Sequence, residues 1–166
     1  AVDLGNSMTL VAGKVTFDST LDGSEALSIT GNADFFGPVG DITPLTSLSI
    51  SGESLMSNDI TTSGDQTYSG AVTLSDAVTL TGGTVNFQST VDGSTADTEV
   101  LTIVGNVDID AAIGASTPLD ILSVSGTTSL SGNVATGGAQ TYSNTTTLVG
   151  SRTLTGSGIS LAAVSL

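Results

Sequence analysis

This chain repeats itself at long range. The segment VTFDSTLDGS, residues 15–24, returns as VNFQSTVDGS, residues 85–94, with seven of the ten letters identical. The offset between equivalent residues is 70 up to residue 24 and 74 from residue 27, because the segment STADTEV contains a four-residue insertion. The further matches are LSITGN with LTIVGN and QTYS with QTYS, at residues 27–32 and 101–106, and at 66–69 and 140–143. Self-similarity at a fixed period is typical of proteins that stack repeated units along one axis.

The repeats divide the chain into tandem units rather than into separate domains. One unit covers about residues 8–77 and the next about residues 78–151, with partial repeats at both ends. The sequence thus begins and ends within a unit, as expected for a segment of a longer array. We therefore expect residues 1–166 to form a single solenoid segment.

A shorter signal lies inside each unit: an apolar residue, Ser or Thr, and a second apolar residue, followed closely by Gly. A mostly apolar pair and then a third apolar position come after it, so each turn offers about three short strands separated by turn residues. The signals are 19, 21, 30, 23, 21 and 30 residues apart, and three intervals add up to one long unit. They start at Met8, Leu27, Leu48, Val78, Leu101, Leu122 and Arg152.

Three short strands in each turn are typical of a parallel β-helix. Strand residues alternate between the two sides of a sheet, so both apolar residues of each signal are expected to point inward. We therefore expect an all-β solenoid, right-handed by the usual crossover rule, with about seven turns of three strands. An antiparallel sandwich of repeated hairpins is the alternative. The expected interior stacks are Met8, Leu27, Leu48, Val78, Leu101 and Leu122, and Leu10, Ile29, Ile50, Leu80, Ile103, Val124 and Leu154.

The composition argues against several classes of partner. The formal net charge is −14, from 16 acidic residues against Lys14 and Arg152, so the clustered basic residues that bind nucleic acid are absent. An anionic membrane surface would repel the chain for the same reason. No apolar run approaches the ~18 residues of a transmembrane helix, so we expect no membrane insertion. The absence of Cys rules out disulfide bonds and thiolate metal sites.

The style of the repeats carries a family resemblance. Acidic segments with few aromatic residues and much Gly, Ser, Thr, Val and Asp include VTFDSTLDGSEALSITGNADFFG and TTSGDQTYSGAVTL. They resemble the repeats of very large bacterial surface adhesins of the filamentous-haemagglutinin and autotransporter type. The resemblance covers residues 1–161 and rests on repeat style, with no catalytic motif to match. It implies a secreted β-helical shaft, extracellular or at the cell surface, that serves adhesion or acts as a structural stalk.

Few residues could carry chemistry. Without His, Cys or Trp, the chain lacks catalytic triads, imidazole metal sites and thiol chemistry. β-Helical enzymes that cleave polysaccharides need a base or an acid pair in a groove, often with Arg or Lys. Here Lys14 and Arg152 lie nearly two long units apart. We therefore expect no enzyme activity, no catalytic residue and no cofactor, and keep a carbohydrate-active enzyme as an alternative.

The acidic residues are mostly expected at turns or on solvent-facing columns. Asp22-Gly23 and Asp92-Gly93 have the composition of turns. Asp108 and Asp110 are two residues apart and could share one strand face, which makes them weak candidates for a Ca²⁺ site. Asp34 is expected in the same outward column as Asp108, three turns or ~14 Å away, too far to share one ion.

Tyr68 and Tyr142 occupy equivalent positions in the two longest turns. Each ring could be a platform on which a ligand stacks, so these residues are weak ligand-binding candidates. The alternative is a ring that folds over the edge of the coil and covers apolar core.

Hydroxyl groups are expected in two outward columns. Such columns are typical of ice-binding solenoids, but here Ser replaces many Thr residues, two positions are Val, and turn length varies. Small hydroxyl residues covering a solvated sheet are the simpler interpretation. The columns are Thr9, Ser28, Ser49, Thr79, Thr102, Ser123 and Thr153, and Val11, Thr30, Ser51, Thr81, Val104, Ser125 and Thr155.

The sequence as a whole favours a structural role. The leading expectation is a non-catalytic shaft segment of an exported bacterial surface protein, adhesin or filament. Its partners are neighbouring repeats of a longer chain or other copies in end-to-end association, with the apolar tail at residues 159–166 as the contact. The alternatives are a module that binds a cell-surface glycan or protein, a carbohydrate-active enzyme and an ice-binding solenoid.

Overall fold

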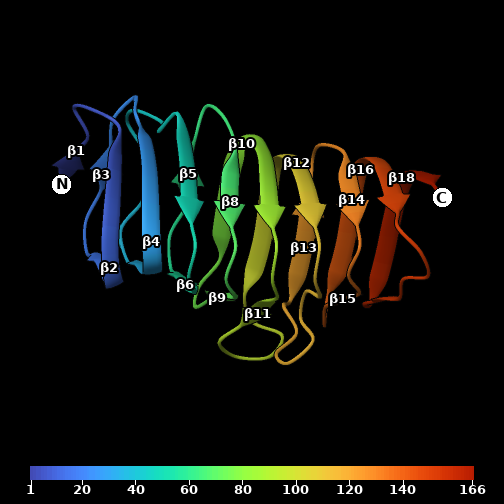
Figure 1. The fold of residues 1–166 in the computed structure, drawn as a ribbon. Helices are drawn as coiled ribbons and strands as arrows, with labels where there is room; N and C mark the ends of the chain where they lie inside the picture. Colours follow the sequence, from blue (N-terminus) through green and yellow to red (C-terminus); the bar gives the residue numbers. More distant parts are fainter.

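The computed structural model describes residues 1–166, which are all-β with no helix. Strands about 19 residues apart lie side by side, and the chain coils into a β-solenoid of about nine turns. Figure 1 shows the rod with the two termini at opposite ends. The parallel β-helix is therefore confirmed. The antiparallel sandwich is wrong, because every strand pairing is parallel.

Eighteen strands make up the coil, and a membrane-spanning helix is not found among its elements. The strands are β1 (Val2–Asp3), β2 (Met8–Phe17), β3 (Leu21–Asp22), β4 (Ala26–Phe35), β5 (Ser47–Ile50), β6 (Ser54–Met56), β7 (Ile60–Thr61), β8 (Gln66–Tyr68), β9 (Val72–Leu74), β10 (Val78–Phe87), β11 (Val91–Gly93), β12 (Val100–Ile109), β13 (Ile121–Val124), β14 (Thr128–Leu130), β15 (Val134–Ala135), β16 (Ala139–Leu148), β17 (Leu154–Thr155) and β18 (Gly158–Ser165).

Three faces run along the rod, and we define each by a column of stacked inward residues. Face 1 holds Leu10, Ile29, Ile50, Tyr68, Phe87, Ile109, Leu130 and Leu148. Face 2 holds Val15, Ala33, Ser54, Val72, Val91, Ile113, Val134 and Leu154. Face 3 holds Val2, Leu21, Val39, Ile60, Leu80, Ile103, Val124, Tyr142 and Leu161, one for each of nine turns.

The expected count of seven turns is wrong because two turns lack the apolar signal. Gln66 pairs with Leu48 on one side and with Val85 on the other, so β8 is a complete rung of face 1. On face 3, Gln140 of β16 likewise pairs with Leu122 of β13 on one side and with Ile159 of β18 on the other. In both turns an inward Gln stands where the signal requires an apolar residue, so the signal does not mark them. Each interval of 30 residues between signals contains one of these two unmarked turns.

The long repeat does not complete a whole number of turns. After Gln66 on face 1, the chain returns to that face at Val85, Val107 and Thr128, and then crosses face 2. The equivalent residue, Gln140, follows on face 3. One unit therefore spans three and two-thirds turns, so counting one turn for each of its three intervals between signals is wrong. Equivalent residues of the two units lie a third of a turn apart around the rod.

This rotation also corrects the expected interior stacks. The stack of Leu27 on Leu48 is confirmed, but the residue above Leu48 is Gln66 and not Val78. Val78 belongs to face 3, where β10 pairs with β12. The second expected stack divides among Leu10, Ile29 and Ile50 on face 1, Leu80, Ile103 and Val124 on face 3, and Leu154 on face 2.

A single apolar interior runs through the rod. Its inward side chains form one cluster of 31 buried residues. Aromatic rings of neighbouring turns stack, with centroids 5.3 Å apart for Phe17 and Phe35 and 5.5 Å apart for Tyr68 and Phe87. One turn cannot bury its apolar side chains alone, so the stability of each turn depends on its neighbours.

Glycine shapes one corner between two faces in each unit. Gly31, in the bent strand β4, has a φ of 130°, and a Cβ there would meet the carbonyl oxygen of Ala12 at 1.7 Å. Gly105, in β12, has a φ of 144°, and its Cβ would meet the carbonyl oxygen of Gly82 at 2.1 Å. Only glycine fits both the backbone conformation and the close approach of the previous turn, which explains why ITGN returns as IVGN.

Candidate functional site

The first QTY segment forms a polar unit inside the core. Tyr68 is 0% exposed, and its hydroxyl donates a hydrogen bond of 2.7 Å to Oε1 of Gln66. Nε2 of Gln66 donates to the carbonyl oxygens of Thr81 at 2.9 Å and Ile60 at 3.2 Å, and to Oγ1 of Thr62 at 3.3 Å. Burying these polar groups is tolerated because they find partners in one another and in the surrounding backbone.

The second unit repeats this arrangement on face 3. The Tyr142 hydroxyl donates to Oε1 of Gln140 at 3.1 Å, and Nε2 of Gln140 donates to the carbonyl oxygen of Thr155 at 2.8 Å. Burial raises the pKa of both tyrosines, because a phenolate in the core would lose its hydration. Both rings are buried, so neither offers a surface on which a ligand could stack, and both are core residues.

The two Asp-Gly segments lie in or at the end of strands and are not turns. Asp22 ends β3, and Asp92 is the middle residue of β11. Oδ1 of Asp22 accepts hydrogen bonds from the backbone N–H groups of residues 42 and 43 at 2.9 and 3.2 Å. Oδ1 of Asp92 accepts equivalent bonds from residues 116 and 117 at 2.8 and 3.0 Å. The repeated aspartate therefore fixes a loop of the next turn.

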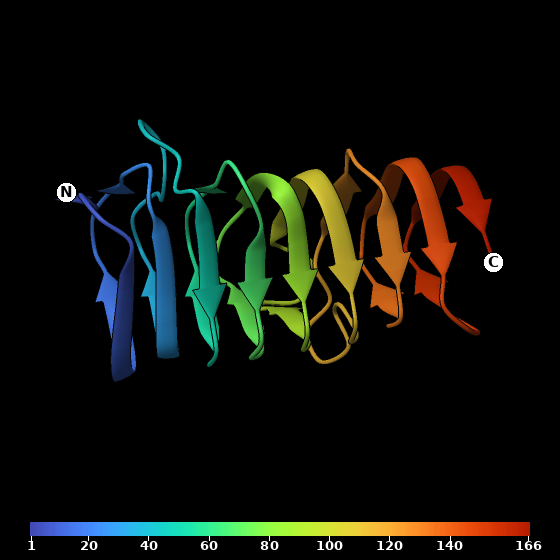
Figure 2. The same ribbon diagram turned by 45° about the horizontal axis from the view of Figure 1, so that its top comes forward.

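These loops, at residues 40–46 and 114–120, are equivalent but leave the rod on different sides. Figure 2 shows the first in cyan along the upper edge and the second in yellow along the lower edge. Gly40 and Gly114 open the loops with φ values of 68° and 69°. The same local sequence thus builds the same loop after a rotation of a third of a turn.

Other Asp and Asn side chains join successive turns by the same kind of bond. In each pair, an Oδ1 atom accepts a backbone N–H from a residue 19–21 positions later, which lies in the next turn. Such Asp and Asn side chains are structural acceptors at the corners of the coil. The pairs are Asn32 with Glu53, Asp59 with Thr79, Asp65 with Thr84, Asn106 with Thr127 and Asn133 with Thr153, at 2.7–3.0 Å.

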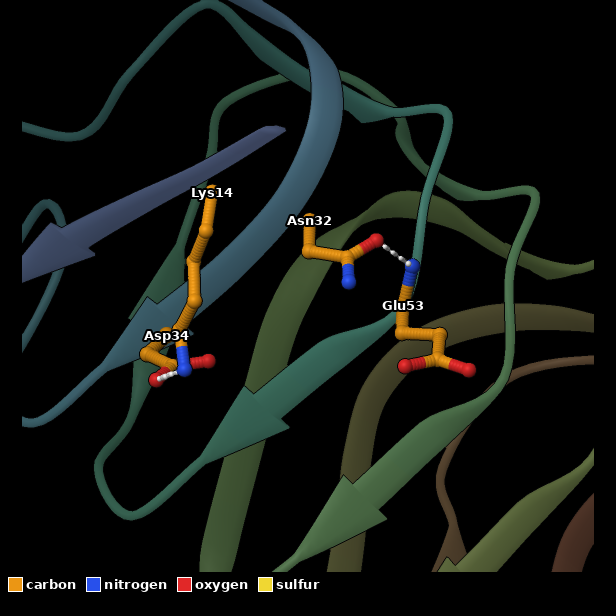
Figure 3. A network of polar contacts seen from close by, with 4 residues as sticks. All are labelled: Lys14, Asn32, Asp34 and Glu53. Carbon is orange, nitrogen blue, oxygen red and sulfur yellow. Dashed lines mark hydrogen bonds and ion pairs between the residues drawn. The ribbon is translucent and has the colours of Figure 1, made fainter. Parts of the chain in front are cut away.

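One charged pair lies in a shallow depression on face 2. Nζ of Lys14 forms an ion pair with Oδ2 of Asp34, which is 7% exposed (Figure 3). The depression has a volume of about 230 Å³ and is also lined by Asn32 and Glu53. Figure 3 shows the Glu53 carboxylate apart from the pair, with Asn32 between them. Lys14 supplies the partner that a nearly buried carboxylate requires, and Thr84 takes its place in the second unit.

A second depression, of about 260 Å³, lies over face 2 farther along the rod. It has no charged residue, and most of its lining side chains are small. Its chemistry is that of an apolar surface with a few hydroxyl and amide groups. The lining residues are Ala112, Ile113, Ala115, Asn133, Val134, Ala135, Thr153 and Thr155.

Asp108 and Asp110 do not join other acids in a cluster. Asp108 is half-buried on the outer side of face 1, and Asp110 is exposed just after the end of β12. The structure brings together no group of three or more His, Cys, Asp or Glu side chains that could hold a metal ion. Asp34 lies on face 2 beside Thr16, so the expected column of Asp34 with Asp108 is wrong. The rotation between units separates these two equivalent residues.

In the second unit the four-residue insertion precedes a buried carboxylate, Glu99, whose counterpart in the first unit, Glu25, is half-buried, and sequence reasoning missed this difference. Oε1 of Glu99 accepts hydrogen bonds from the Ser94 hydroxyl at 2.7 Å and the Thr95 N–H at 3.0 Å, whereas Oε2 has no partner. Burial opposes ionisation of Glu99, but hydrogen bonds from Ser94, Thr98 and Thr95 outweigh it and lower the pKa. The carboxylate fills the space beside Gly93, where a Cβ would meet Oε2 at 2.3 Å.

The expected hydroxyl columns are divided between faces. Thr9, Ser28 and Ser49 are neighbours on face 1, where the column continues through Thr67, Asn86 and Asp108. Thr79, Thr102 and Ser123 are neighbours on face 3. No column of hydroxyl groups runs the length of the rod, and a regular lattice of that kind is what the ice-binding alternative requires.

Comparison with known proteins gives no match to a protein family, a curated protein or a solved structure. The assignment of a role therefore depends on the fold and on the contacts described above.

Proposed function

We propose that this chain is a structural shaft segment of an exported bacterial surface protein, adhesin or filament, without a catalytic role. The observation that carries the proposal is the unbroken interior, a single apolar cluster of 31 buried residues that extends through about nine turns. Such a stack keeps its two ends at a fixed separation. The resemblance of the repeats to those of bacterial surface adhesins supports a location outside the cell or at its surface.

The contacts between turns suit a spacer. Backbone hydrogen bonds between parallel strands of successive turns run along the axis of the rod. The Asp and Asn side chains at the corners add further bonds in the same direction, from one turn to the next. Resistance to stretching and bending is therefore distributed over the whole length.

The test is a measurement of the distance between labels at the two ends. The chain has no Cys, so Thr9→Cys and Ser160→Cys provide unique positions, separated by about eight layers or ~37 Å along the axis. A shaft gives one narrow distance distribution that added glycans do not change. A broad distribution, or turnover of any member of a polysaccharide panel, would contradict the proposal.

A second candidate is a module that binds a glycan or a protein through the loop at residues 40–46. The favouring observation is that Ile42 is 80% exposed while Asp22 holds the adjacent backbone in place. An apolar side chain on a fixed loop is suited to a contact with a partner. Glycan-array and cell-surface binding by the wild type, lost in Ile42→Ser and retained in Ser116→Ala of the equivalent loop, would favour this candidate over a passive shaft.

A further inference from the structure

The polar depression on face 2 has an exposed aromatic ring beside it. Residues of β2, β4, β6 and β9 line the depression, which lies on a side of the rod and not on one of its ends. Phe36 is 44% exposed and is the only ring among the exposed large hydrophobic side chains. It follows Asp34 by two positions, and Phe35 between them points inward, so Phe36 and Asp34 lie on the same outer side of the coil.

The polar groups around this depression have unused hydrogen-bonding capacity. Asn32 accepts the backbone N–H of Glu53 through Oδ1 at 2.9 Å, which leaves its Nδ2 as a free donor. The Glu53 carboxylate is exposed and has no hydrogen-bond or ion-pair partner. Lys14 carries three donor hydrogens, of which the pair with Asp34 does not use all. Donors and acceptors thus lie side by side around Asn32 (Figure 3).

The equivalent place in the second unit offers an internal comparison. Asn106 there keeps the bond of its Oδ1 to the backbone of the next turn, and the Thr127 hydroxyl donates to the same oxygen at 2.9 Å. Neither depression of the rod lies at this place. The coil therefore builds this corner without four of the side chains found in the first unit. The replacements are Lys14 by Thr84, Phe36 by Asp110, Glu53 by Thr127 and Leu55 by Ser129.

This combination of groups suits a pyranose ring. Sugar hydroxyl groups donate to carboxylates and accept from ammonium and amide groups, while the C–H groups of the ring pack against apolar side chains. The volume of about 230 Å³ is below the ~300–1,000 Å³ of most ligand pockets, so it suits a single ring. A net charge of −14 and the free carboxylate of Glu53 oppose an acidic sugar, so the ring is uncharged.

We propose that one uncharged pyranose unit of a glycan binds in the depression on face 2. Its hydroxyl groups donate to the Glu53 carboxylate and accept from Nδ2 of Asn32 and Nζ of Lys14. Its C–H groups pack against Phe36 and Leu55. The inference goes beyond the proposed function, because it gives a shaft a place where a sugar is held.

A titration followed by NMR tests the site. The probes are the methyl pyranosides of glucose, galactose, mannose and N-acetylglucosamine, added to the isotope-labelled full chain up to millimolar concentrations. At least one probe should shift the side-chain amide signals of Asn32 in a saturable way. Glu53→Gln should weaken its binding by about tenfold, because hydrogen bonds to a charged group are among the stronger ones. Phe36→Ser should also weaken binding, through loss of the ring.

The matched control is Asp110→Asn, which removes an exposed carboxylate at the position equivalent to Phe36 and should leave the affinity unchanged. Glu53 and Phe36 are both exposed, so their variants should keep the fold, and circular dichroism establishes that they do.

Saturable shifts at Asn32 that both Glu53→Gln and Phe36→Ser weaken support the proposal. Four probes without any shift, or binding that Glu53→Gln leaves unchanged, overturn it. Binding that is lost only in Ile42→Ser assigns the sugar to the loop at residues 40–46 and also overturns it. The shaft proposal is tested separately, because a narrow distance distribution between labels at the two ends would leave it standing in each of these cases.

Discussion

Replacing Tyr68 with Phe removes one oxygen atom from the interior and keeps the ring that stacks on Phe87. The substitution leaves Oε1 of Gln66, which is fully buried, without its 2.7 Å hydrogen bond. An unsatisfied buried acceptor costs about 1–3 kcal/mol, and we expect the free energy of unfolding to fall by that amount. Tyr142→Phe should cost less, because its bond to Gln140 is longer, at 3.1 Å.

Urea denaturation followed by circular dichroism measures the effect. Thr67→Val, between Gln66 and Tyr68 but pointing outward, is the matched control and should change stability by less than about 0.5 kcal/mol. In a Gln66→Leu background the acceptor is absent, so Tyr68→Phe should cost about 1 kcal/mol less than in the wild type. The reasoning fails if Tyr68→Phe is neutral, or if it costs the same in both backgrounds.

Four further outcomes are expected. Gly31→Ala should lower the free energy of unfolding by more than about 1 kcal/mol, whereas Gly13→Ala, with no atom within 4 Å of its Cβ, should be nearly neutral in the same urea assay. Asp92→Ala should release the loop at residues 114–120 and speed its cleavage in limited proteolysis, and Asp110→Ala should not. Both buried tyrosines have a pKa raised above 10.0, so their contribution to the free energy of unfolding is complete below pH 10 and falls above it, by about 1.4 kcal/mol per pH unit for each tyrosine. Urea denaturation between about pH 9 and 12 measures this slope, and one Tyr→Phe substitution should halve it. Calorimetric titration with Ca²⁺ should show no micromolar binding, and binding abolished by Asp108→Asn would reveal a metal site.

The fold could be predicted because inward and outward residues alternate along each strand of a parallel coil, which produces a regular alternation of apolar and polar residues in the sequence. Ile29 and Ile50 are stacked and buried, as the apolar signal indicates. The number of turns could not be predicted in the same way, because a buried Gln violates the rule that inward residues are apolar. The exact repetition of QTY was the available signal, since an inward Gln two residues from an inward Tyr can be satisfied within the core.

The roles of the aspartates were hidden for a different reason. Local sequence preference predicts Asp22 and Asp92 at local chain turns, but their hydrogen-bond partners lie in the next turn of the coil, 20 to 25 residues away. Local patterns do not reveal such contacts without the register between turns. The register between turns also determines that Asp34 and Asp108 lie on different faces, although they occupy equivalent positions in the two units.

Because equivalent residues of the two units lie a third of a turn apart, the equivalent loops emerge at different edges of the rod. The loop at residues 40–46 emerges between faces 3 and 1, and the equivalent loop at residues 114–120 emerges between faces 2 and 3. Were further units of the same length to follow, the loop would visit each of the three edges in turn and return to the first after three units, or eleven turns. Whatever those loops present would then wind around the shaft as a spiral, within reach of neighbours in every direction around it.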